Sequence, residues 1–302
     1  MFRRLFLPAG LAWLATFGWA QDQPVGPGRT PQESMPIYSR IRGLFDIELP
    51  RLDPPGTVKL ILYPHIGDLI RRDYIRTDLG FRWALNDHFE LSTAASTYLP
   101  HGFSPDSTGY GLGEMNYGLK YIVHDWLQPG NDASISLAIK QPTGQPPADL
   151  TDGHNHYTPS FVVQHRSGQY PHLSTFAGTT LDLVTASGAA GNFQLNQPHE
   201  HSLSVLAGGV YDMGQLKWTL SGTYATTALI GKNPEHFFYL QPGLVWYVPK
   251  KMAFPTKTQW VISLSAPMSW GPDGYQFSLT SRLRAEITFR QVMATMRGAS
   301  LR

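Results

Sequence analysis

Two His-x-His pairs are the residues of this chain whose type and spacing could bind a metal ion. His154 and His156 form one pair, and His199 and His201 form the other. In an extended strand, residues two apart project from the same face, so each pair could offer two imidazole nitrogens. Four such nitrogens would suit Zn, Cu or Ni. Histidine is also a common polar residue of loops, and loops that never meet would bind no metal, so both interpretations stay open.

The tripeptide His172-Leu173-Ser174 has the residue types of nucleophilic catalysis, because an imidazole can take the proton of a nearby serine hydroxyl. No G-x-S-x-G nucleophile elbow occurs in the chain. The chain also contains no Cys, which excludes disulfides, thiolate metal sites and a catalytic thiol. We therefore expect no enzymatic activity and no cofactor.

Strands must position these side chains, because apolar and polar residues alternate with a period of two from Gly56 onward. Between residues 75 and 83, apolar or neutral residues hold the odd positions, while Arg76, Asp78 and Arg82 stand at even positions. Such alternation predicts strands with two unlike faces. Twelve strands are predicted, over residues 57–67, 73–85, 89–99, 110–124, 133–142, 156–166, 172–186, 200–211, 215–229, 237–249, 258–270 and 275–289.

The connections between these strands alternate between short turns and longer polar loops. An even number of antiparallel strands connected in this way predicts an all-β transmembrane antiparallel barrel. The alternative is a soluble β-sandwich or lipocalin-like barrel, but most predicted strands exceed the ~5–6 residues usual in soluble sheets and suit the ~9–11 that cross a bilayer. Aromatic residues also gather near strand ends, as interfacial girdles require. They are Trp83, Phe89, Tyr98, Tyr121, Trp126, Tyr224, Phe237, Phe238, Trp246, Tyr247, Trp260, Trp270 and Tyr275.

Charged residues of these strands fall on the face that would line the lumen of the barrel. They are Arg76, Asp78, Arg82, Glu90, Glu114, Lys120, Lys140, Asp182, Lys217, Arg282, Arg284 and Glu286. Mixed signs on the first and last strands, which meet when the barrel closes, predict ion pairs there. These charges could form a constriction that selects solutes. They could equally fill a narrow lumen with salt bridges and allow no conduction.

Particular motifs of the chain resemble a known family. Pro54-Pro55-Gly56-Thr57-Val58 precedes the first long strand. The string from Gly111 to Tyr121 has the form G-x-G-E-x-x-x-G-x-K-Y, and a later strand ends in Pro142-Thr143-Gly144. This pattern resembles the outer-membrane family named for the meta-pathway of phenol degradation, a group of predicted barrel transporters. The resemblance implies passage of small compounds, including hydrophobic or aromatic ones, across the outer membrane.

The first twenty residues predict a signal peptide that is cleaved after Ala20. Arg3 and Arg4 precede an apolar core, and a small-x-small site ends it. We expect a periplasmic lead-in over residues 21–55, with a candidate short strand at Ile41–Leu49. The barrel is then expected over residues 56–290 and a periplasmic C-terminal tail over 291–302.

The charge balance gives no support to a nucleic-acid partner, and we expect none. The chain has 24 Lys+Arg and 22 Asp+Glu, a net charge of +2, and removal of Arg3 and Arg4 with the signal peptide brings this to zero. The expected partners are outer-membrane lipid, a small-molecule solute and the barrel assembly machinery during biogenesis. The expected function is passive passage or binding of small solutes. A plugged structural or binding barrel, or an outer-membrane lipid hydrolase, are the alternatives.

Overall fold

The computed structural model describes residues 49–64, 74–100, 111–143, 153–186, 201–229, 234–249, 252, 258–272 and 274–288. The predicted signal peptide, the C-terminal tail and most of the lead-in lie outside these residues. So does most of the candidate strand at Ile41–Leu49, although Leu49 itself is described and belongs to no strand.

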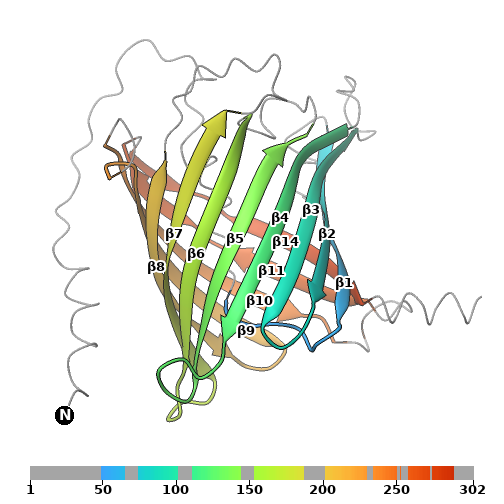
Figure 1. The fold of residues 1–302 in the computed structure, drawn as a ribbon, viewed down its shortest axis with the longest axis vertical. Helices are drawn as coiled ribbons and strands as arrows, with labels where there is room; N and C mark the ends of the chain where they lie inside the picture. The colour runs from blue at the N-terminus through green and yellow to red at the C-terminus, as the bar shows by residue number, and fades with distance from the viewer. Residues whose placement is uncertain are drawn as a thin grey trace, which may run out of the picture.

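The described strands form one antiparallel sheet that closes into a barrel (Figure 1). Closure occurs because β1 pairs with β2 on one side and with β14 on the other. The strands are β1 (Val58–Pro64), β2 (Tyr74–Ala84), β3 (Phe89–Pro100), β4 (Gly111–Val123), β5 (Asn131–Pro142), β6 (His154–Arg166), β7 (Leu173–Ala186), β8 (Ser202–Asp212), β9 (Leu216–Thr226), β10 (His236–Tyr247), β11 (Gln259–Ser265), β12 (Met268–Gly271), β13 (Gly274–Phe277) and β14 (Thr280–Thr288).

The last two predicted strands are each interrupted. Strands β11 and β12 both pair with β10 and share one place in the wall, and β13 and β14 share the next, so the barrel has twelve strand positions. The first interruption lies at Ala266 and Pro267, where proline lacks the N–H that a ladder requires. The sequence pattern did not predict these breaks. The predicted fold class and the twelve-stranded barrel are confirmed, and no strand end differs by more than three residues.

The outward face of the wall is apolar. Its side chains include many large exposed hydrophobic residues, among them Leu79, Leu91, Leu119, Ile135, Val205, Trp218 and Leu220. Along each strand these residues alternate with the polar residues that point inward, which is the pattern of a wall surrounded by lipid. Among the described residues, no helix is long and apolar enough to cross a bilayer.

Three of the predicted girdle aromatics lie on the inner face instead. Tyr98 is buried and stands opposite inward Arg76 in the ladder. Tyr247 lies beneath the Lys217 ammonium, with 5.3 Å between the Nζ and the ring centroid. Phe237 shares the inward register of β10 with Tyr239 and Tyr247. The prediction was wrong for these three because closeness to a strand end does not determine which face a residue occupies; parity does.

Candidate functional site

The inner face of the wall carries the charged residues that alternation pointed to. Strand register places on this face Arg76, Asp78, Arg82, Glu90, Glu114, Lys120, Lys140, Asp182, Lys217, Arg282, Arg284 and Glu286. Their placement follows from the two-residue period of each strand. Their role in selecting solutes stays a prediction.

A buried charge cluster joins β2, β3 and β4 near one end of the lumen. We call this the short-turn end, because the short turns over residues 85–88 and 124–130 lie there. Glu90 is 3% exposed and Lys120 is 5% exposed. The Glu90 carboxylate lies 3.8 Å from Lys120 Nζ and 3.5 Å from Arg82 Nε. A buried charge is tolerated only when it is paired, so each group of this cluster stabilises the others.

A second pair, Lys140 and Glu114, lies nearer the long-loop end, with 2.9 Å between the two charged atoms. Glu114 points inward by the same alternation as Asn116 and Lys120, and the register of β3 and β4 shifts just beyond it, between Ser96 and Thr97. Ser96 faces Glu114 and Thr97 faces Leu112, so Gly113 is the extra residue of a bulge. The glycine of the G-x-G-E string therefore lies at the point where the wall changes register.

The seam between β14 and β1 carries a third group of charges. Lys59 Nζ lies 3.2 Å from Glu286 and 2.6 Å from Asp53, while Arg284 lies 2.9 Å from Glu286. The sequence prediction named Glu286 and Arg284 but missed Lys59. Alternation along the first strand could have found it, because Lys59 shares its parity with Tyr63.

The other predicted inward charges also have neighbours on adjacent strands or turns. Ser96 donates to Asp78 over 2.6 Å, and Lys217 binds Asp212 over 2.6 Å. The Arg282 guanidinium lies over the Tyr63 ring, 5.8 Å from its centroid.

Residues 49–53, which we call the lumen segment, cross the lumen near its short-turn end. After the segment, Gly56 joins the wall by donating to the Ala84 carbonyl at the end of β2. At its other end, Leu49 packs against a buried cluster of Val162, Phe176, Leu206 and Val210. That cluster belongs to β6, β7 and β8, which stand on the opposite side of a ring of twelve positions. The segment therefore bridges the two walls.

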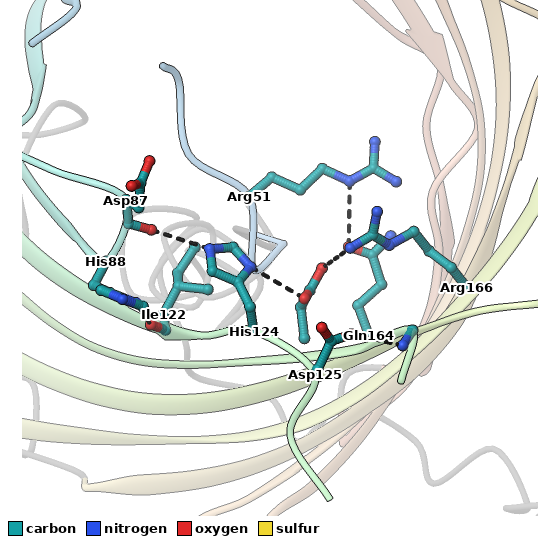
Figure 2. A network of polar contacts seen from close by, with 10 residues as sticks. Arg51, Asp87, His88, Ile122, His124, Asp125, Gln164 and Arg166 are labelled. Atoms are coloured by element: carbon teal, nitrogen blue, oxygen red, sulfur yellow. Dashed lines mark hydrogen bonds and ion pairs between the residues drawn. The ribbon is translucent and has the colours of Figure 1, made fainter. Parts of the chain in front are cut away.

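Several contacts hold the lumen segment in place. Lys120 Nζ donates to the Leu49 carbonyl oxygen over 3.4 Å, and Pro50 is fully buried. Arg51 Nε donates to Gln164 Oε1 over 3.3 Å. Figure 2 shows Arg51 reaching from the segment toward Gln164 and Arg166 on the wall. No sequence pattern marked this segment, because it has no periodicity and its partners are far away in the chain.

A histidine-centred network lies at the same end of the barrel (Figure 2). His124 follows β4, and its ring nitrogens lie 3.0 Å from the Asp87 carbonyl oxygen and 3.2 Å from an Asp132 carboxylate oxygen. Arg166 donates to the other Asp132 oxygen over 2.5 Å. Both atoms facing the ring of His124 are acceptors, so the doubly protonated imidazolium satisfies both. The Asp87 carbonyl and then Asp132 raise the pKa of His124 above its ordinary 6.5.

The structure engages the predicted metal-binding histidines in other contacts. His156 Nδ1 lies 2.9 Å from a buried Asp182 oxygen, and Thr158 donates to the same carboxylate. His201 Nδ1 accepts the backbone N–H of Val184. His154 opens β6 on the same face as His156, and His199 lies outside the described residues. Within the described part of the chain, no group of three or more His, Asp or Glu could hold a metal ion.

The residues of the His-x-Ser tripeptide point in different directions. Ser174 is buried on the inner face of β7. The His172 ring lies in the preceding turn beside Tyr211, an exposed residue of the outer face, with ring centroids 6.1 Å apart. The structure therefore does not bring the imidazole and the hydroxyl together.

Comparisons with known proteins show the fold. No family model and no curated protein matches the chain. Among solved structures, 35 chains match. One is an outer membrane channel from Pseudomonas putida F1, with a TM-score of 0.51 at 9% identity, covering 81% of this chain and 100% of the other. Outer membrane phospholipase A from Escherichia coli reaches only 0.35 at 12% identity, covering 80% and 93%, a score too low to support any argument. The chain is thus similar in fold to an outer-membrane barrel.

Proposed function

We propose that this chain lies in the bacterial outer membrane and lets small solutes pass through its lumen without an energy source. The observation that carries this proposal is the closed wall with an apolar outer face and a charged inner face. A wall of this kind satisfies its backbone hydrogen bonds in lipid and offers solutes a polar route. The likeness in fold to an outer membrane channel supports the same function.

The solutes and partners in this proposal follow from the sequence. The motifs around Gly111–Tyr121 resemble the meta-pathway phenol-degradation family, which supports small hydrophobic or aromatic compounds as solutes. Cleavage after Ala20 would deliver the chain to the periplasm, where the barrel assembly machinery would insert it into outer-membrane lipid. We propose no enzymatic activity, because the His172 and Ser174 side chains lie apart.

A plugged, non-conducting barrel is the second candidate. The lumen segment favours it, because residues 49–53 bridge opposite walls. The buried ion pairs of Glu90 and Lys120 also occupy part of the bore. In the proposed channel, by contrast, the segment narrows the route and leaves solutes a path beside it.

Liposome swelling separates the two candidates. Proteoliposomes would be tested with sugars, amino acids and aromatic acids of increasing size, and current would be recorded in planar bilayers. Heat-modifiable migration on gels would first establish that the barrel is folded. Swelling that falls with solute size supports the channel. A folded barrel with neither swelling nor current would instead establish the plugged barrel.

A further inference from the structure

Two arginines come together where the lumen segment meets the wall. Arg51 donates its Nε to Gln164, and Gln164 and Arg166 are two residues apart on the inward face of β6. The Cα atoms of residues two apart in a strand, such as Gln164 and Arg166, are separated by about 6.6 Å. Because Arg51 binds Gln164, its guanidinium group lies against the same part of β6 as that of Arg166. Figure 2 shows both side chains projecting into the same space.

Hydrogen-bond donors at this place outnumber the acceptors. Arg51 uses its Nε, and neither of its terminal nitrogens makes a hydrogen bond within the part of the chain that the structure describes. Arg166 uses one terminal nitrogen on Asp132, and its side chain is 59% exposed. The Gln164 amide nitrogen is buried and has no partner among the described residues. A buried donor without an acceptor, such as the Gln164 amide nitrogen, costs free energy, so an acceptor bound beside it would be stabilised, while the exposed guanidinium groups supply further donors.

The surrounding charges favour an anionic acceptor. At the short-turn end, the described inward-facing cations are Arg51, Lys59, Arg82, Lys120, Arg166, Lys217 and Arg284, and the carboxylates are Asp53, Glu90, Asp132, Asp212 and Glu286. Each of these carboxylates already lies against a cation of the wall. Asp212 also interacts electrostatically with Arg51. The local excess of positive charge attracts anions, and low-dielectric walls strengthen such a field.

We propose that Arg51, Gln164 and Arg166 form a binding site for the carboxylate of a small organic anion. A guanidinium presents a planar fork of donors that matches the two oxygens of a carboxylate. The proposal rests on the proposed function, because the site lies on the route through the lumen. It adds a substrate class: small organic acids in their ionised form.

Benzoate and its neutral analogue benzamide test the site on the folded, detergent-solubilised barrel. Ligand-observed NMR would measure the dissociation constant of each compound. Arg166→Gln is the informative variant, because it leaves the contacts of Leu49 and Arg51 with the wall in place. Loss of a charge-assisted hydrogen bond should weaken benzoate about tenfold and leave benzamide unchanged. Arg166→Lys keeps the positive charge but loses the planar fork of donors, so its benzoate affinity should lie between those of the wild type and Arg166→Gln.

The same proteins would be compared in planar bilayers under a KCl gradient. The wild type should favour chloride, and Arg166→Gln should reduce that preference. Equal binding of benzoate and benzamide, or equal benzoate affinity in the wild type and Arg166→Gln, would overturn the anion site even if the barrel conducts. Absence of current together with Arg166-dependent benzoate binding would overturn the channel and leave the anion site in place.

Discussion

Truncation of Leu49 is the most direct test of whether the lumen segment limits passage. Leu49 anchors the segment on the wall opposite its attachment at Gly56, through contacts with Val162, Phe176 and Leu206. Leu49→Ala removes most of this apolar contact. It keeps the carbonyl group that accepts from Lys120, so the hydrogen bonds of the segment are unchanged.

The size of the effect follows from burial. Full burial of a leucine side chain contributes about 1.5–3 kcal/mol, and Leu49 is half-buried. The substitution should therefore destabilise the seated state, in which Leu49 packs against the opposite wall, by about 1 kcal/mol relative to the unseated state, in which the segment has left that wall. That cost raises the ratio of unseated to seated segment about fivefold. If the seated segment narrows the route, the ratio of wide to narrow dwell times in single-channel records should rise by the same factor.

Leu127→Ala is the matched control. Leu127 lies at the same end of the barrel but is 82% exposed, so its truncation should leave the records unchanged. A thiol probe gives a second measurement, because the chain has no Cys. A single cysteine introduced by Pro50→Cys, at a fully buried position, should react with maleimide about fivefold faster when Leu49 is also truncated. If both the dwell times and the labelling rate stay at their wild-type values in a folded barrel, the segment does not control the lumen.

Three further perturbations test the wall and its charges. Glu90→Gln removes the carboxylate that faces buried Lys120, so the free energy of unfolding in urea should fall by about 3 kcal/mol, whereas Asp125→Asn in an exposed turn should change it little. His124 should titrate with a pKa above 6.5 in NMR spectra. Because the folded state raises this pKa, protonation of His124 stabilises the barrel at low pH, and the stabilisation should disappear as pH rises through the raised pKa. The His124→Ala variant should lack this pH-dependent contribution to the free energy of unfolding. Gly208→Ala would push a Cβ into the Phe176 ring and the Leu220 carbonyl and should destabilise the barrel by about 1–3 kcal/mol, while Gly209→Ala, with its nearest atom at 3.6 Å, should not; equal stability of the two variants would contradict the packing.

Alternation predicted the wall because each strand must separate a lipid face from a lumen face. That constraint acts at every second residue, so it is visible in the chain without any knowledge of partners. It located all twelve strand positions and the inward charges from Arg76 to Glu286. It could not show the interruption at Pro267, because a local break changes the pairing and not the pattern of polarity.

The contacts of the candidate site depend on a different kind of information. Glu90 has the parity of an inward residue, but its closeness to Lys120 depends on the register of β3 and β4, which the Gly113 bulge shifts. Arg166 stands at the end of a strand, where the sequence pattern stops, and therefore escaped the prediction.

The lumen segment explains why the site could not be predicted from parity alone. Arg51 meets Gln164 across 113 positions of sequence, and nothing near Arg51 specifies that contact. The contact is stabilised by the packing of Leu49 on an apolar cluster of the opposite wall and by hydrogen bonds between the segment and side chains of the wall. A segment held by a few weak contacts can leave at modest cost, whereas the wall cannot open without breaking its ladders. In the proposed channel, substitutions at residues 49–53 should therefore change the selectivity for solutes while the hydrogen-bonded wall stays intact.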